Sequence, residues 1–409
     1  MGRSGPSDNI RSAVASLDVV VVGGCGHVGL PLGLAFASRG LRTAVYDINQ
    51  VSVETVSAGT MPFNEPGAPE VLRQVLEQGT FRATSDPQIL SEAESVVVVI
   101  GTPIDKHLNP EALEVPGEIA KLSRHFVDGQ LLVLRSTLYP GVTALVEQKL
   151  AADGREIDVA FCPERIAEGK AMVELFSLPQ LVSGRTAAAR ERAGKLFLQL
   201  TAEVVELTPE EAELAKLFTN TWRYIKFATA NQLFMIANDF GLDYSKIREA
   251  LARNYPRAHD MPSAGLAAGP CLLKDTMQLA AFNNNQFTLG HSAMLINEGL
   301  PLYTVAKLER RFRLSELTVG VLGMAFKADS DDIRSSLSYR LKRILAFKAK
   351  RVLCTDPYVL SDPDLVPLEQ VLREADLLVI GAPHEVYRQV ATDLPVVDLT
   401  NLRGQGSLV

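Results

Sequence analysis

The chain contains 409 residues, of which 47% are hydrophobic and 22% are charged, and these ordinary values predict two or three globular domains with real cores. Its formal net charge of −7 argues against a nucleic-acid-binding protein, which would carry a basic patch. No apolar run approaches the ~18 residues that a membrane span needs. We therefore expect neither a nucleic-acid partner nor a membrane partner.

The four cysteines lie far apart and show no Cys-x-x-Cys spacing. A disulfide framework or a zinc site is therefore not expected, and a reducing, cytoplasmic setting fits best. The six histidines also lack metal-like spacing, so no metal site is predicted. The cysteines are Cys25, Cys162, Cys271 and Cys354.

The first 16 residues are small and polar, and we interpret residues 1–16 as a disordered leader. Region 17–207 then alternates apolar, β-branched runs with helical patterns. This alternation is typical of a doubly wound α/β domain, with a Gly-rich turn after its first strand. The strand candidates are 19–22, 43–47, 95–101, 131–136, 158–162, 180–184 and 202–207.

Region 208–313 changes character, because no strand pattern occurs from Pro209 to Phe240. Pro209 with two following glutamates is a typical helix start and Gly241 a typical stop, which predicts one helix of about 30 residues. Strand patterns resume in region 314–409. The predicted fold is therefore α/β, with two Rossmann-like doubly wound domains joined by a helical middle domain with one long central helix.

The first turn predicts a dinucleotide site. Its Gly-x-Gly-x-x-Gly pattern lies between a strand and a helix, where glycines permit a tight turn, close approach of a phosphate and close packing of the helix. Asp47 ends the next strand and can accept hydrogen bonds from both ribose hydroxyls, which favours NAD over NADP. The predicted cofactor contacts are Gly24, Gly26, His27, Val28, Gly29 and Asp47.

Six further motifs, in order along the chain, resemble the UDP-glucose/GDP-mannose dehydrogenase family of nucleotide-sugar 6-dehydrogenases. The resemblance implies oxidation of the sugar C6 from alcohol to acid with two NAD per turnover and no release of the aldehyde. The motifs are GTPID at 101–105, RSTLYPGVT at 135–143, CPERIAEGKA at 162–171, AELAKLFTNTWR at 212–223, GPCLLKD at 269–275 and GMAFKADSDDIRSS at 323–336.

The resemblance also implies catalytic roles. Cys271 matches the nucleophile that captures the aldehyde as a thiohemiacetal and then carries the thioester. Lys216 and Asn220, four residues apart on the long helix, match groups that stabilise the oxyanion. Glu164 matches the residue that activates the hydrolytic water. Either Lys216 or a water held by Asp275 could take the first proton, and Thr137 completes the predicted set.

Further contacts follow from the same resemblance. Arg257 matches an arginine that crosses to a neighbouring subunit, so a homodimer or a higher homo-oligomer is expected, with the long helix at its interface. Asp331 and Asp332 are expected to cap the helix that follows them. The remaining predicted cofactor contacts are Thr102, Thr137, Glu168, Lys274 and Arg334, and the predicted substrate contacts are Glu164, Arg165, Lys216, Asn220, Arg257, Gly269 and Lys327.

The identity of the sugar is ambiguous. Ala268-Gly269 stands where glucose oxidisers of the family usually have Gly-Gly, and the 14 residues from Arg257 to Cys271 resemble the branch that acts on N-acetylated hexosamines. The KDT sequence after the cysteine resembles the glucose branch. We expect UDP-glucose or dTDP-glucose, with a UDP-N-acetylhexosamine as the alternative.

Two other functions compete with this four-electron reaction. A two-electron hydroxyacid-type dehydrogenase would use the helix lysine but would give Cys271 no role. A non-catalytic NAD-binding protein would not need Lys216, Asn220, Glu164 and Cys271 together, and all four are present.

Overall fold

The computed structural model describes residues 15–102, 105, 111–267 and 269–409. Most of the predicted leader (1–14), Pro103 and Ile104 of one motif, and Ala268 lie outside the described residues. The chain divides into two compact units, Met1–Leu217 and Phe218–Val409. The predicted boundaries at 207/208 and 313/314 stay predictions.

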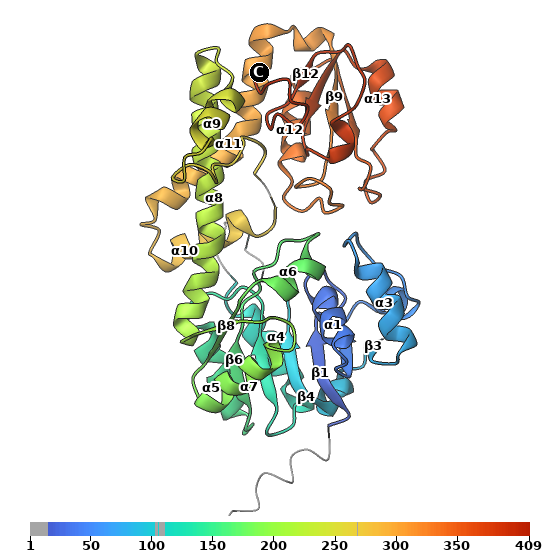
Figure 1. Ribbon diagram of the computed structural model, residues 1–409, viewed down its shortest axis with the longest axis vertical. Coiled ribbons are helices and arrows are strands. Elements are labelled where there is room, and N and C mark those ends of the chain that lie inside the picture. The colour runs from blue at the N-terminus through green and yellow to red at the C-terminus, as the bar shows by residue number, and fades with distance from the viewer. Residues whose placement is uncertain (1–14, 103–104, 106–110, 268) are drawn as a thin grey trace, which may run out of the picture. The chain divides into compact units, whose positions relative to one another are not determined.

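The first unit is built on an eight-stranded sheet in the order β3-β2-β1-β4-β5-β6-β7-β8 (Figure 1). Neighbouring strands are parallel except β6 and β7, which are antiparallel. The sequence patterns had missed β3. The strands are β1 (Leu17–Val22), β2 (Thr43–Tyr46), β3 (Phe81–Thr84), β4 (Ala93–Val98), β5 (Leu131–Leu134), β6 (Asp158–Phe161), β7 (Gln180–Gly184) and β8 (Val204–Leu207).

Both faces of this sheet are buried, which explains its continuous apolar strands. Along β1, Val19 and Val21 belong to one core with α1, α3, α6 and α7. Val20 and Val22 belong to a second core with α4 and α5 on the opposite face. The helices are α1 (Gly29–Ser38), α2 (Gln50–Ser57), α3 (Ala68–Glu77), α4 (Glu114–Leu122), α5 (Val142–Ala152), α6 (Ala171–Ser177) and α7 (Ala187–Phe197), with short 3₁₀ turns η1 (Pro87–Glu92) and η2 (Ser123–His125).

The long central helix is α8 (Pro209–Asp239), drawn yellow-green in Figure 1. Its 31 residues rise about 47 Å at 1.5 Å per residue, and its bounds confirm the predicted helix. Three further helices follow: α9 (Tyr244–Ala252), α10 (Leu272–Phe282) and α11 (Thr288–Arg311). Among the described residues, no helix combines the length and the apolar content needed to cross a membrane.

The second unit contains a four-stranded parallel sheet in the order β10-β9-β11-β12, orange to red in Figure 1. The fold is therefore α/β with two Rossmann-like sheets, as predicted. The elements are η3 (Leu314–Glu316), β9 (Thr318–Leu322), α12 (Leu337–Ala346), β10 (Arg351–Thr355), α13 (Leu368–Glu374), β11 (Leu377–Ile380), η4 (Glu385–Tyr387) and β12 (Val396–Val397).

The predicted cap of α12 was wrong. Ser336 is the N-cap residue, and its side chain accepts a hydrogen bond from the Ser338 N–H. Asp332 instead lies four residues before the cap and forms an ion pair with Arg334. Asp329 and Ser335 adopt positive φ angles of 53° and 54°, so the chain turns twice before the helix can begin.

Candidate active site

The predicted residues of the first unit gather at one edge of its sheet. The strands β1, β4, β5 and β6 are parallel neighbours, so their carboxyl ends meet at the same edge. The order reverses between β1 and β4, and open α/β sheets bind ligands at such a point. The glycine turn follows β1, Thr102 follows β4, Thr137 follows β5 and Glu164 follows β6.

Glycine is needed in the turn after β1 for two different reasons. A Cβ at Gly24 would lie 2.4 Å from the Val45 Cβ, and one at Gly29 would lie 2.3 Å from the Gly23 carbonyl oxygen. These two glycines let the turn and α1 pack against the sheet. A Cβ at Gly26 would meet nothing closer than 3.6 Å, so packing does not require glycine there. The open space at Gly26 fits the approach of a dinucleotide phosphate.

Gly23, which the sequence analysis did not assign, is the most restricted glycine of this turn. Its φ is +71°, and a Cβ there would lie 1.9 Å from the Val99 carbonyl oxygen. The adjacent Gly23-Gly24 pair hides this role, because either residue could supply the first glycine of the pattern.

Asp47 lies beside the turn at the end of β2, as predicted. Its Oδ2 accepts a hydrogen bond of 3.0 Å from the Cys25 N–H, and its Oδ1 accepts one of 3.0 Å from the Asn49 N–H. The side chain is half-buried, so it can still contact a ligand. His27 stacks at 4.1 Å on Phe63, and its buried Nδ1 has no hydrogen-bond partner among the described residues. Val28 is the N-cap residue of α1.

Glu164 is buried directly after β6. Its Oε1 accepts hydrogen bonds from the backbone N–H groups of Arg165 (2.6 Å) and Ile166 (2.8 Å), and its Oε2 forms an ion pair with Arg135. The sequence analysis gave Arg135 no role. The Arg165 side chain donates to the Pro179 carbonyl oxygen, and burial lowers the pKa of its guanidinium.

Two more carboxylates hold the loop that continues from Glu164. Glu174 accepts a hydrogen bond of 2.6 Å from the Ala167 N–H. Glu65, which is 1% exposed, accepts bonds of 2.8 Å from the N–H groups of Gly169 and Ala171. Glu168, a predicted cofactor contact, lies within this loop and is half-buried. The loop is therefore ordered by acceptors from three separate positions.

The start of α8 is fixed to the same unit. Glu213 is buried, and it accepts hydrogen bonds from the backbone N–H groups of Gly141 (2.7 Å) and Thr143 (2.9 Å) at the start of α5. Lys216 follows three residues later and is also buried. Its ammonium forms no hydrogen bond or ion pair with any described residue of the chain, and a buried charge without a counter-charge is typical of a ligand site.

The second unit brings four predicted residues together on α8 and α10. Asn220 Nδ2 donates a hydrogen bond of 2.6 Å to Asp275 Oδ2, and both side chains are buried. The Asp275 Oδ1 lies 3.6 Å from the Lys274 ammonium. Cys271 is the N-cap residue of α10, and its carbonyl oxygen accepts from the Asp275 N–H at 2.9 Å. The helix therefore begins directly after the thiol, as predicted.

The four thiols differ in exposure. Cys271 is exposed, whereas the other three are buried. Burial raises the pKa of the Cys25 and Cys162 thiols to about 12 and that of Cys354 to about 11. A thiol reacts as its thiolate, so these three are unreactive and Cys271 is the accessible thiol.

The other predicted residues of the second unit lie in two loops. Gly269 has a φ of +111°, and a Cβ there would lie 2.7 Å from the Phe326 ring. Lys327 lies with its ammonium 5.5 Å from the same ring centroid. Arg334 is held by Asp332 through bonds of 2.6 to 3.0 Å. Arg257 is exposed and donates to the Tyr255 hydroxyl at 3.3 Å.

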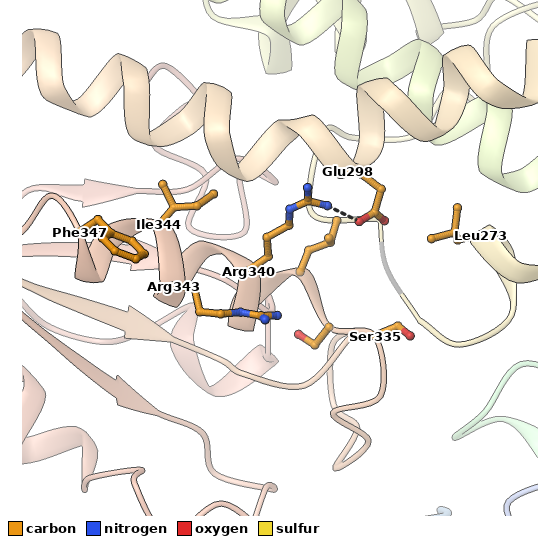
Figure 2. Close-up of a pocket in the computed structure, with 9 residues that line it drawn as sticks. Leu273, Glu298, Ser335, Arg340, Arg343, Ile344 and Phe347 are labelled. Atoms are coloured by element: carbon orange, nitrogen blue, oxygen red, sulfur yellow. Dashed lines mark hydrogen bonds and ion pairs between the residues drawn. The ribbon is translucent and has the colours of Figure 1, made fainter. Parts of the chain in front are cut away.

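A cavity of about 530 Å³ lies elsewhere in the second unit, between α11 and α12 (Figure 2). Arg340 reaches from α12 to Glu298 on α11 with a bond of 2.7 Å across it. None of the predicted site residues lines this cavity. Within the described part of the chain, no group of three or more His, Cys, Asp or Glu side chains could hold a metal ion.

Three family models match consecutive parts of the chain. The NAD binding domain of the UDP-glucose/GDP-mannose dehydrogenase family matches residues 18–201. The central domain of that family matches 210–299, and its UDP binding domain matches 320–403. Together they match most of both sheets and nearly all of the long helix.

Individual proteins agree with this match. The UDP-N-acetyl-D-mannosamine dehydrogenase of Yersinia pestis is 29% identical over 405 residues, covering 92% of this chain and 96% of that protein. The solved UDP-D-ManNAc dehydrogenase of Pyrococcus horikoshii has a TM-score of 0.85 at 27% identity, covering 94% of this chain and 96% of its own. A solved UDP-glucose dehydrogenase of Pyrobaculum islandicum has a TM-score of 0.86 at 26% identity, covering 96% of both chains.

Proposed function

Because this chain belongs to the UDP-glucose/GDP-mannose dehydrogenase family and is an NAD-dependent nucleotide-sugar dehydrogenase, we propose that it oxidises a UDP-N-acetylhexosamine to the uronic acid. UDP-N-acetyl-D-mannosamine is the first candidate, since the relatives from Yersinia pestis and Pyrococcus horikoshii carry that name. This choice replaces the UDP-glucose or dTDP-glucose that we expected from sequence.

The spacing around the thiol supports the choice. The spacing of 14 residues from Arg257 to Cys271 resembles the N-acetylhexosamine branch, whereas the KDT sequence after the thiol resembles the glucose branch. The fold itself does not separate the sugars, because the solved UDP-glucose and UDP-D-ManNAc enzymes match it equally well. The residues around the substrate must therefore decide the specificity.

The proposed reaction removes four electrons in two steps, and bound NAD accepts a hydride in each. After the first step the aldehyde carbon is attacked by the Cys271 thiolate, which forms a C–S bond. After the second step the carbon is held as a thioester. Water then adds, the C–S bond breaks, and the acid leaves with Cys271 restored. The overall balance is alcohol, water and two NAD⁺ to carboxylate, two NADH and three protons.

The chain's own groups have distinct tasks in this sequence. Lys216 and Asn220 would stabilise the negative oxygen that forms at C6. The Asn220–Asp275 hydrogen bond of 2.6 Å orients the amide beside that oxygen. The Asp275 Oδ1, which has no hydrogen-bond partner among the described residues, can hold a water for the first proton transfer. Glu164 would activate the water of the last step.

The exposed Cys271 at the start of α10 is the observation that carries this proposal. The test is to screen UDP-N-acetylmannosamine, UDP-N-acetylglucosamine, UDP-glucose, dTDP-glucose and GDP-mannose for NADH formation and to analyse the product. Two NADH per uronate on an N-acetylated sugar supports the proposal. One NADH per released aldehyde, or full activity of Cys271→Ala, would favour a two-electron dehydrogenase.

A homodimer is part of the proposal. On α8 the apolar side chains Phe218, Trp222, Leu233 and Ile236 are all exposed, and their spacing places them along one side of the helix. Phe240, directly after the helix, is exposed as well. A stripe of this kind marks a protein interface. Sedimentation velocity should give a dimer for the wild type and a monomer for Trp222→Glu with Ile236→Glu. A cytoplasmic location stays a prediction from cysteine usage.

A further inference from the structure

A buried arginine stands at the sheet edge that carries the predicted site. Arg135 follows β5 directly and is 1% exposed. Its Nη1 donates to the Cys162 carbonyl oxygen (3.1 Å) and to Gln180 Oε1 (3.0 Å), and its guanidinium stacks at 4.7 Å over the Phe197 ring. A guanidinium cannot lose its proton in a protein, so its burial requires a counter-charge.

Glu164 is the carboxylate that pairs with Arg135 within the described residues. Arg135 Nη2 binds Oε2, the loop N–H groups of Arg165 and Ile166 bind Oε1, and the Glu164 N–H donates to the Arg135 carbonyl oxygen at 3.2 Å. Donors therefore fix both carboxylate oxygens from two directions. The Glu164 side chain keeps 11% of its surface exposed, so one side remains open.

The buried Arg135–Glu164 ion pair is not the most stabilising way to connect the ends of β5 and β6. Replacing a buried ion pair by apolar side chains of similar volume is often neutral or stabilising, whereas removing one partner is strongly destabilising. Stability alone would therefore not select an arginine here. The pair lies after the carboxyl ends of β5 and β6, where the predicted site residues of the first unit gather.

We propose that Arg135 is a positioning residue for the hydrolysis of the Cys271 thioester, acting through Glu164. This inference rests on the proposed function, in which water attacks the acyl carbon while the C–S bond breaks and its electron pair leaves on the Cys271 sulfur. Arg135 holds the Glu164 carboxylate in the one orientation whose open side can accept the proton of that water. The oxidation steps do not use this carboxylate, so they should survive its displacement.

The test compares single turnovers and steady-state rates of Arg135→Gln, Arg135→Lys, Glu164→Gln and the double variant Arg135→Gln with Glu164→Gln. In Arg135→Gln we expect a burst of two NADH per active site, an acyl adduct on Cys271 in the intact mass, and a steady-state kcat lowered about 10- to 100-fold. KM for the sugar and for NAD should change by less than about threefold. Arg135→Lys should recover part of kcat, because it keeps the charge but not the set of guanidinium donors that bind Glu164, Gln180 and the Cys162 carbonyl oxygen together.

The double variant tests whether the two residues act as one unit. If Arg135 acts through Glu164, the double variant should be no slower than Glu164→Gln alone. Arg192→Gln is the matched control. Arg192 also binds a backbone carbonyl (Gly129, 2.9 Å) and a carboxylate (Asp158, 2.9 Å), but at the opposite end of β6. It should show no burst and no loss of kcat.

Other outcomes overturn the inference. If Arg135→Gln loses the NADH burst, Arg135 acts in the oxidation steps or in folding. The same conclusion follows if the losses of kcat in the two single variants multiply in the double variant. Should Arg135→Gln fail to fold, Arg135→Lys decides by the same burst and adduct. If wild type releases one NADH and an aldehyde, the proposed function itself fails. Glu164→Gln could accumulate the acyl adduct while Arg135→Lys has a lowered kcat and no adduct. In that case the role of Arg135 is wrong and the proposed function still stands.

Discussion

The two Rossmann-like sheets begin with the same local arrangement. Gly23 after β1 and Gly323 after β9 both have positive φ angles, +71° and +90°. A Cβ would lie 1.9 Å from the Val99 carbonyl oxygen in the first and 2.3 Å from the Ala382 carbonyl oxygen in the second. In each case the next strand ends in an aspartate, and that aspartate accepts backbone N–H groups from the residues after the glycine.

The aspartates are used differently. Asp47 is half-buried beside a short turn, and the Cys25 N–H is its one contact from that turn. Asp356 has a fully buried side chain, and it accepts bonds from four backbone N–H groups and from His384 Nε2. The Asp329 N–H donates to His384 Nδ1 at 2.8 Å, which places the ring proton on Nε2.

This contrast shows how one arrangement can serve a ligand or the protein itself. In the first unit the acid stays accessible, and the turn is short enough for α1 to begin at Gly29. In the second unit Asp356 accepts hydrogen bonds from the start of the loop that runs from Gly323 to Ser336 and carries Lys327 and Arg334. Its carboxylate is therefore not accessible to a ligand. A strand–glycine–aspartate pattern alone therefore does not predict a dinucleotide site.

The largest expected effect is on the two matching glycines. Gly23→Ala and Gly323→Ala should each destabilise the protein by about 3 kcal/mol or more, because a positive φ costs about 1–2 kcal/mol for alanine and overpacking adds about 1–3 kcal/mol. Urea unfolding measures both. Equal stability of either variant and wild type would contradict the shared geometry.

Asp356→Asn should cost about 3 kcal/mol, since it leaves buried donors without a charged acceptor. Burial raises the pKa of Asp356, but the hydrogen bonds from His384 and the backbone outweigh it and hold the pKa below its ordinary value of 3.8. The stabilisation is therefore complete above pH 3.8 and is lost as the pH falls through the lower folded-state pKa. In urea unfolding, the difference in unfolding free energy between wild type and Asp356→Asn should become smaller as the pH falls below 3.8.

Substitutions of Gly26 and Asp47 should have a smaller effect, which is limited to the affinity for the cofactor. Gly26→Ala should weaken NAD binding at least tenfold, about 1.4 kcal/mol, while changing unfolding free energy by less than about 1 kcal/mol, because its Cβ meets no protein atom within 3.6 Å. Asp47→Asn should lose about 1.5–3 kcal/mol of NAD affinity and bind NADP relatively better. Fluorescence titration with NADH and NADPH measures both. Destabilisation of Gly26→Ala without loss of affinity would argue against a phosphate at this turn.

The smallest effect concerns one buried thiol from each unit, Cys25 and Cys354. Cys25→Ala and Cys354→Ala should each retain one fast-reacting thiol per native chain, as wild type does, and Cys271→Ala should retain none. The reason is burial, which raises the pKa of Cys25 to about 12 and that of Cys354 to about 11. Titration with a chromogenic disulfide measures this, and a second fast thiol in wild type would contradict it.

Much of the fold could be predicted because its signals are local. The β-branched run of β1 and the uninterrupted helical pattern of α8 determine those elements almost residue by residue. The strand β3 was missed because its four residues alternate weakly and lie at the sheet edge. The antiparallel direction of β7 was also invisible, since a strand's sequence does not encode which way its neighbour runs.

The placement of the glycine turn beside Asp47 could be predicted from sequence because strand, turn and helix follow one another directly. The roles of these residues stay predictions. Arg135 was quoted in a motif but received no role, because nothing adjacent indicates that it is buried and its partner Glu164 is 29 residues away. Asp332 was misassigned as a cap because the positive-φ turn at Ser335 delays the start of α12 to Leu337.

Gly269 limits how this protein can be redesigned. Its α-carbon faces the Phe326 ring so closely that a Cβ would lie 2.7 Å from a ring carbon, and it stands two residues before the thiol. Libraries that aim to alter sugar preference by varying the residues around Cys271 should leave this position unchanged. A side chain at Gly269 would displace the Phe326 ring and would not add a contact to the hexose.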